Sequence, residues 1–267
     1  MPLEETMRVP RALTTALLAL ATAFAVPAAP ASAAEDATRN AAENYVALGD
    51  SYSSGTGAGD YSDLLCTRSG NAYPAQWAQA SAPASFTFAA CGGAKIPDVL
   101  DNQVRYLDQS TTLVSISIGG NDSGFASIML TCMFSSQSTC EQRLDEAADY
   151  ARNELPGELD ALYATIRDRA PNAEVVVVGY PHLYKEGGFC LSMGSGKREA
   201  INDGSDVLNQ VISGRAAAAG FSFADARPAF AGHEICTSDP WISSSNIHPT
   251  AEGHEKGYLP AFSAAVR

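Results

Sequence analysis

The sequence predicts an α/β protein in which a central, mostly parallel sheet lies between two layers of helices. Compact runs of β-branched residues at 113–118 and 175–178 are typical of buried parallel strands. Helical patterns separate nearly all of the β-rich runs, which favours a sheet covered on both faces. The chain has 267 residues, 46% hydrophobic and 18% charged, and this composition excludes a disordered or collagen-like protein.

The elements alternate along the chain. The β-rich runs cover residues 44–48, 85–90, 113–119, 174–180 and 221–226. Helical patterns cover residues 73–80, 97–107, 140–170, 198–219 and 249–265. Five strands in this alternation predict a three-layer α/β/α, flavodoxin-like arrangement. No repeat, linker or low-complexity segment follows residue 43, so we expect one domain over residues 34–267.

The first 33 residues have the pattern of a secretory signal peptide. Arg8 and Arg11 precede the apolar run 12–26, and small residues Ala-Ser-Ala end at Ala33. The apolar run is shorter than the roughly 20 residues that span a bilayer. Because the stretch before Met7 is acidic, we expect the true start at Met7. Removal of residues 1–33 leaves a chain expected to be secreted, extracellular and monomeric, without stable membrane insertion.

The net charge argues against a nucleic acid partner, and the cysteine content agrees with secretion. The formal net charge of −13 disfavours binding to nucleic acid phosphates, so no nucleic acid partner is expected. An even number of cysteines in a secreted chain favours disulfides, and the absence of a C-x-x-C pair weakens a zinc site. From the residues alone, six cysteines allow 15 pairings. The cysteines are Cys66, Cys91, Cys132, Cys140, Cys190 and Cys236.

Small and polar residues follow three of the predicted strands, in segments 49–55, 91–94 and 119–122. Ligands of open α/β sheets bind beyond the carboxyl ends of the strands, so these segments are expected to converge there. Glycines allow close backbone approach, and the amides at helix N-termini attract negative charge. Such preorganised donors are what an oxyanion hole requires.

Ser51 is the candidate nucleophile of this region, although a serine after a strand is also a common helix N-cap. A nucleophile needs a base, and His248, in the loop before the last predicted helix, is the preferred candidate. His182 follows the fourth strand and is the alternative base. His233 is expected to be structural, and His254 to be a solvated residue of the last helix.

The ordered motifs resemble the SGNH (GDSL) hydrolases. Gly49-Asp50-Ser51, Gly93, Asn121 within Gly-Gly-Asn-Asp, and His248-Pro249 are similar to the four blocks of that family in order and spacing. Taken with the six cysteines, the chain is most similar to secreted actinobacterial lipases and phospholipases A1. No G-x-S-x-G elbow of the classical α/β-hydrolases occurs.

The resemblance implies the site residues. Ser51 would be the nucleophile and His248 the base, while the amides of Ser51 and Gly93 and the side chain of Asn121 would form the oxyanion hole. No metal and no cofactor is implied. The expected activity is hydrolysis of lipid esters by a phospholipase A1, lipase or esterase. The alternatives are an inactive secreted binding protein on the same fold and a short-chain or carbohydrate esterase.

This sequence departs from the family where the histidine is oriented. The aspartate usual three residues before the histidine is Ser245. We expect the main-chain carbonyl of Ser245 to accept the histidine proton, with the carbonyl of Asn246 or the carboxylate of Asp239 as alternatives. The resemblance also implies disulfides in sequence order, namely Cys66–Cys91, Cys132–Cys140 and Cys190–Cys236.

Two apolar stretches are candidates for an acyl groove. Helical spacing is also typical of a core, and for most of these residues a core position is the favoured interpretation. Methionine and phenylalanine near a strand-end crevice nevertheless suit an adaptable lipid site. The residues are Phe125, Ile128, Met129, Leu130, Met133 and Phe134, followed by Leu183, Tyr184, Phe189, Leu191 and Met193.

Overall fold

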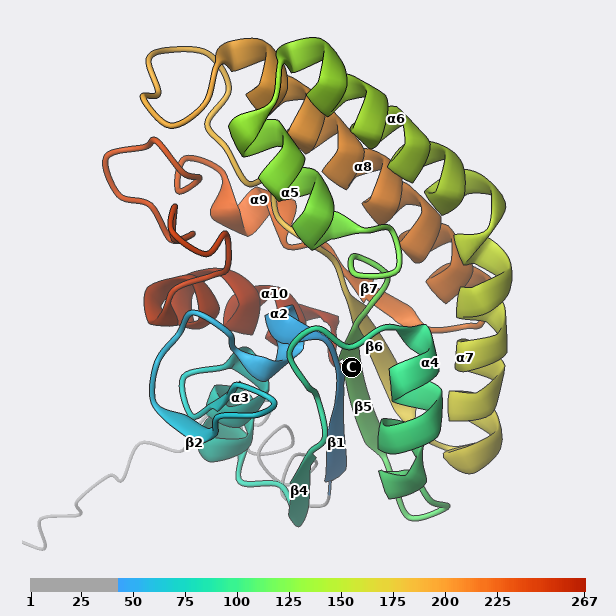
Figure 1. Ribbon diagram of the computed structural model, residues 1–267. Helices are drawn as coiled ribbons and strands as arrows, with labels where there is room; N and C mark the ends of the chain where they lie inside the picture. Colours follow the sequence, from blue (N-terminus) through green and yellow to red (C-terminus); the bar gives the residue numbers. More distant parts are fainter. Residues whose placement is uncertain (1–42) are drawn as a thin grey trace, which may run out of the picture.

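A computed structural model describes residues 43–267, and its centre is a parallel five-stranded sheet (Figure 1). The order is β4-β1-β5-β6-β7, and every neighbouring pair is parallel. The predicted α/β/α fold is therefore confirmed. The strands are β1 (Asn44–Gly49), β4 (Ser85–Phe88), β5 (Leu113–Ser117), β6 (Glu174–Val178) and β7 (Ser222–Ala224).

Two layers of helices cover the sheet. On one face lie α3 (Tyr73–Ser81) and α10 (Leu259–Ala265), and on the other α7 (Leu155–Arg169) and α8 (Ser195–Ala218) (Figure 1). The strand β5 is buried along its whole length, as expected of a strand with helices on both sides. Helix α6 (Gln137–Asn153) extends the second layer by packing along α8, and α5 (Phe125–Phe134) packs against α6.

Three predicted helices differ in detail. The pattern at 140–170 forms two helices, α6 and α7, because Pro156 lies in the first turn of α7 and cannot continue a helical hydrogen-bond ladder. The pattern at 97–107 is divided into α4 (Ile96–Asp98), a π-turn η1 (Val99–Gln103) and a 3-10 turn η2 (Val104–Tyr106). The last helical segment begins at Ala251 and continues through the π-helical η3 (Gly253–Tyr258), whereas Pro249 pairs with Ile242 in an isolated bridge.

Further short elements have no counterpart among the predicted ranges. These are α2 (Ser51–Ser54), the hairpin of β2 (Tyr61–Asp63) and β3 (Arg68–Ser69), helix α5, and α9 (Arg227–Phe230). The hairpin lies apart from the main sheet and has mostly accessible residues, so it lacks the buried alternation that reveals a strand.

Disulfides join Cys66 to Cys91, Cys132 to Cys140 and Cys190 to Cys236. These are the pairs that the family resemblance implied. The Cys132–Cys140 bridge joins helices α5 and α6, whereas the other two bridges each join two loops. Within residues 43–267, no helix is both long enough and apolar enough to cross a membrane. The predicted signal peptide, residues 1–33, and the start at Met7 lie outside the described residues.

Candidate active site

Three strand ends meet at one point of the sheet. The amide of Asp50, just after β1, donates to the Ser117 carbonyl oxygen of β5 at 2.9 Å, and the Cys91 amide donates to the Gly49 carbonyl oxygen at 3.0 Å. Gly49 has φ +121°, and a Cβ there would lie 2.5 Å from the Ser117 carbonyl oxygen. Glycine is therefore required where β1 turns into α2 beside β5.

Ser51 and His248 lie together at this point, although 197 positions separate them in the sequence. Ser51 Oγ is 2.8 Å from His248 Nε2. Ser51 is the first residue of α2, and Asp50 caps that helix by accepting a hydrogen bond from the Tyr52 amide. The N-cap position thus belongs to Asp50, which leaves the Ser51 hydroxyl available to the histidine.

The hydrogen bond of the second ring nitrogen fixes the tautomer of His248. Its Nδ1 is 2.6 Å from the carbonyl oxygen of Asn246, which can only accept a hydrogen bond. The neutral ring consequently carries its proton on Nδ1 and presents an unprotonated Nε2 to Ser51. Burial lowers the pKa of His248 below its ordinary value, and the hydrogen bond to Asn246 opposes part of that effect.

The sequence analysis preferred the Ser245 carbonyl as the acceptor of the histidine proton and gave Asn246 and Asp239 as alternatives. In the structure the Asn246 carbonyl is the acceptor. Ser245 is exposed, and its hydroxyl lies 2.9 Å from that of Ser243. The loop turns between the two residues, so that the Asn246 carbonyl faces the imidazole. Asp239, the other alternative, lies elsewhere: its carboxylate is 3.2 Å and its carbonyl oxygen 2.9 Å from Nδ1 of His233.

The three donors expected to form an oxyanion hole are the amides of Ser51 and Gly93 and the side chain of Asn121. Within residues 43–267, the amides of Ser51 and Gly93 donate to no protein acceptor. Gly93 is exposed with φ +78°, and a Cβ there would meet open space. Asn121 Nδ2 donates to the Ala94 carbonyl oxygen at 3.0 Å, which orients the amide and leaves its second hydrogen for a ligand.

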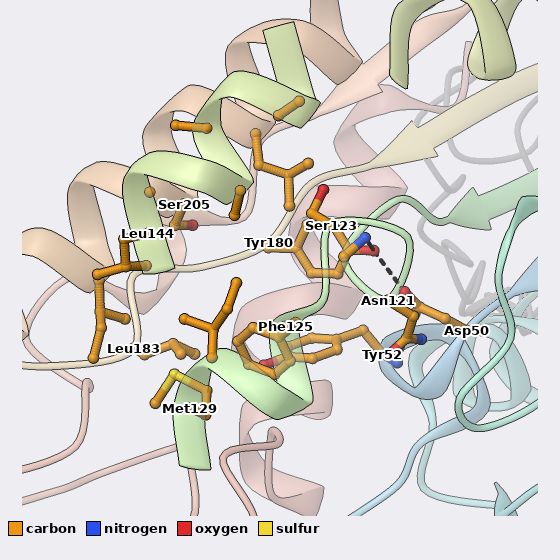
Figure 2. A pocket seen from close by; sticks show the side chains of 18 of the residues that line it. Asp50, Tyr52, Asn121, Ser123, Phe125, Met129, Leu144, Tyr180, Leu183 and Ser205 are labelled. Atoms are coloured by element: carbon orange, nitrogen blue, oxygen red, sulfur yellow. Dashed lines mark hydrogen bonds between the residues drawn. The ribbon is translucent and has the colours of Figure 1, made fainter. Parts of the chain in front are cut away.

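Asp50 forms a buried network directly behind Ser51. Its carboxylate accepts hydrogen bonds from the Tyr180 hydroxyl at 2.5 Å and from the Ser117 hydroxyl at 3.1 Å (the former is dashed in Figure 2). Burial raises the pKa of Asp50 to about 6, while the hydrogen bonds from Tyr180, Tyr52 and Ser117 lower it. The Gly120 amide donates in turn to the Tyr180 hydroxyl at 3.1 Å, so the network reaches the turn that carries Asn121.

The remaining histidines have other surroundings. His182 Nε2 is 2.7 Å from Asp206, and His233 stacks on Trp241 with ring centroids 3.6 Å apart. His254 is fully buried, not solvated as predicted, and burial lowers its pKa to about 3. Its position on the inner side of η3 is the physical reason for the difference.

An apolar pocket opens beside Ser51 and runs between α5, α6 and α8 (Figure 2). Of the candidate groove residues, Phe125, Ile128, Met129 and Leu183 line it. Leu130, Met133, Phe134, Phe189 and Leu191 are exposed, and Tyr184 and Met193 are buried outside its lining. Sequence reasoning missed the far wall, which α6 and α8 supply through Leu144, Ala147, Ala148, Ala151, Ile201, Gly204 and Leu208.

The histidines, cysteines and carboxylates of residues 43–267 form no group of three that could hold a metal ion. The sequence analysis did not identify two tyrosines of the site. The Tyr180 hydroxyl donates to Asp50, and the Tyr52 hydroxyl donates to the Ile247 carbonyl oxygen in the His248 loop. The only signal in the sequence was their position next to a predicted strand end or motif.

Comparisons with known proteins identify the family of the chain. Residues 47–256 match the model of the GDSL-like lipase/acylhydrolase family. The chain is 51% identical over 248 residues to "Lipase 1" of Streptomyces coelicolor, an alignment covering 90% of this chain and 91% of the relative. It is 47% identical over 265 residues to a lipase of Streptomyces rimosus, covering 96% and 98%.

A solved structure of a related protein has the same fold. The crystal structure of phospholipase A1 from Streptomyces albidoflavus superimposes with a TM-score of 0.83 at 49% identity, covering 85% of this chain and all of the other. Fold, matched residues and relatives are thus in agreement. The chain belongs to the GDSL-like lipase/acylhydrolase family.

Proposed function

We propose that this protein hydrolyses carboxylic esters of lipids through an acyl-enzyme on Ser51. The observation that carries the proposal is the 2.8 Å contact between Ser51 Oγ and an unprotonated His248 Nε2. A nucleophile within hydrogen-bond reach of an oriented base is the signature of covalent catalysis by serine. The relatives named lipase and phospholipase A1 support an ester as the substrate.

Each reacting group has a role in the proposed cycle. Ser51 Oγ attacks the ester carbonyl carbon while His248 Nε2 takes the hydroxyl proton. The tetrahedral oxyanion accepts hydrogen bonds from the amides of Ser51 and Gly93 and from Asn121 Nδ2. Collapse expels the alcohol, protonated by His248, and water then releases the acid by the same route. These steps need no cofactor and no metal.

The Asn246 carbonyl is the proposed orienter of His248. It holds the Nδ1 tautomer, as the aspartate of a triad does, but with a partial charge in place of a full one. The imidazolium formed during attack keeps its Nδ1 hydrogen bond to this oxygen. The reaction would thus use a Ser–His dyad.

The apolar pocket is the proposed acyl site. It begins at Ser51 and Asn121, where the ester carbonyl would lie, and its far wall is formed by aliphatic residues of α6 and α8. This depth favours a lipid acyl chain over an acetyl group, and hence a lipase or phospholipase A1 over a short-chain or carbohydrate esterase. The intact set of Ser51, His248, Gly93 and Asn121 argues against an inactive binding protein.

We also propose that residues 1–33 direct secretion and that residues 34–267 form a single, monomeric domain. Three disulfides support an oxidising compartment. A related structure from Streptomyces rimosus is titled an extracellular lipase.

A hydrolysis panel tests the proposed substrate class. Triacylglycerols, soluble esters of increasing chain length, and phospholipids labelled separately at sn-1 and sn-2 are compared, with Ser51→Ala as the blank. Release of long acyl chains that disappears in Ser51→Ala supports the proposal. Activity confined to acetyl esters would reject the lipid substrate, and no labelling of Ser51 by a fluorophosphonate would reject the serine chemistry.

A further inference from the structure

The loop that carries His248 has an unfavourable backbone conformation at its centre. Ile247 has φ +57°, in the left-handed region that β-branched residues rarely adopt. On one side, the Ile247 amide donates to the Ser243 carbonyl oxygen at 2.8 Å, and the Ser243 amide donates to the His248 carbonyl oxygen at 2.9 Å. Such a conformation persists only where surrounding contacts hold it.

The contact on the other side comes from Tyr52. Its hydroxyl donates to the Ile247 carbonyl oxygen at 2.7 Å, and its ring centroid lies 5.1 Å from that of His248. Tyr52 is only 3% exposed, and its amide is anchored on Asp50 Oδ1 at 2.9 Å. Because Tyr52 directly follows Ser51 on α2, one side chain connects the helix of the nucleophile with the loop of the base.

We propose that Tyr52 is a positioning residue, which sets the distance and direction between Ser51 Oγ and His248 Nε2 by holding the Ile247 carbonyl. The proposal rests on the Ser51–His248 chemistry proposed above. With a main-chain orienter in place of a carboxylate, the imidazole is placed only as accurately as the backbone of residues 246–248. A strained backbone therefore needs a fixed external partner, which the tyrosine hydroxyl supplies.

The hydroxyl itself transfers no proton. Burial raises the pKa of Tyr52, and the nearby Asp50 charge raises it further, so that the hydroxyl stays protonated and donates. Its acceptor is a carbonyl oxygen, which has no proton to exchange. The tyrosine acts on the reaction through the His248 loop and not through the substrate ester.

The variant Tyr52→Phe removes only this hydroxyl. We expect kcat on a soluble butanoyl ester to fall about 10- to 100-fold, because small misplacement of reacting groups has effects of that size. KM should stay within about twofold, since the ring that lines the pocket remains. Thermal unfolding is measured on the same samples.

Tyr163→Phe is the matched control. The Tyr163 hydroxyl is also buried, but has no hydrogen-bond partner among the residues that the structure describes. Its removal should leave kcat unchanged. A second variant, Tyr52→para-aminophenylalanine, keeps an N–H donor at the same place and should recover most of the lost kcat.

Three results would overturn the proposal: wild-type kcat in Tyr52→Phe, an equal loss in Tyr163→Phe, or no recovery with the amine. Failure of the dyad chemistry gives a different pattern, because Ser51→Ala would then stay active. An inactive Ser51→Ala beside a fully active Tyr52→Phe rejects the positioning role alone.

Discussion

At the scale of single residues, the proposed reaction depends on keeping His248 neutral until the ester is attacked. The ring is partly buried, and burial lowers its pKa because a charged imidazolium loses hydration. The hydrogen bond to the Asn246 carbonyl raises the pKa again, but by less than burial lowers it. The base form therefore persists to lower pH than in an exposed histidine.

An NMR titration of the His248 ring measures this directly. As pH falls through the pKa, Nε2 becomes protonated and can no longer accept the Ser51 proton. The midpoint should lie below the ordinary histidine value of about 6.5. Asp50, whose pKa is raised to about 6, titrates in the same range, so a ring signal distinguishes the two better than a rate profile. A midpoint above 7 would indicate a carboxylate partner and contradict the main-chain orienter.

Substitutions at Ser245 and Asp239 test whether either residue, in place of the Asn246 carbonyl, orients His248. Neither Ser245→Ala nor Asp239→Asn removes the Asn246 carbonyl, and Asp239 contacts His233 instead. Both variants should keep kcat/KM within about tenfold of wild type. Loss of the orienting aspartate in a protease triad costs about 10⁴-fold. A thousandfold fall in Asp239→Asn would thus establish a charged triad.

At the scale of elements, α5, α6 and α8 form the walls of the proposed acyl pocket, and α6 contributes small residues to its lining. Ala147, Ala148 and Ala151 lie on the face of α6 that meets the pocket. Larger side chains at these positions would fill space that a long acyl chain needs. We therefore expect the preference for acyl chain length to depend on this helix.

The variant Ala148→Phe tests that property. Hydrolysis of a dodecanoyl ester should fall by roughly tenfold or more, while a butanoyl ester stays within about twofold. Asp145→Phe is the control, because Asp145 is exposed on the same helix and does not line the pocket. Equal loss on both esters would show that Ala148 shapes the fold and not the acyl site.

The sequence predicted elements well where their burial pattern is strong. The runs around 113–117 and 174–178 are strands as expected, because their β-branched residues are buried on both faces. Boundaries failed where proline or a π-turn interrupts a helix, as at Pro156 and in η3. The β2–β3 hairpin was missed because its strands are short and their residues are mostly polar and accessible.

At the scale of the whole molecule, the parallel sheet brings together segments from residues 49, 93, 121 and 248. Strand-end motifs predicted that the first three converge, since parallel strands end at one edge. The backbone path of residues 243–248 was beyond sequence reasoning, because it depends on a left-handed Ile247 and on contacts with Tyr52. For that reason the orienting carbonyl was assigned one residue too early.

The central claim is that Ser51 and His248 act as one catalytic unit without a carboxylate. It is tested most directly by the turnover of Ser51→Ala, His248→Ala and the double variant on one ester. We expect each single variant to lose roughly 10⁴- to 10⁶-fold in kcat and the double variant to lose no more, since either loss disables the unit. Ser51→Ala retaining a tenth of wild-type turnover, or losses that multiply in the double variant, would contradict the account.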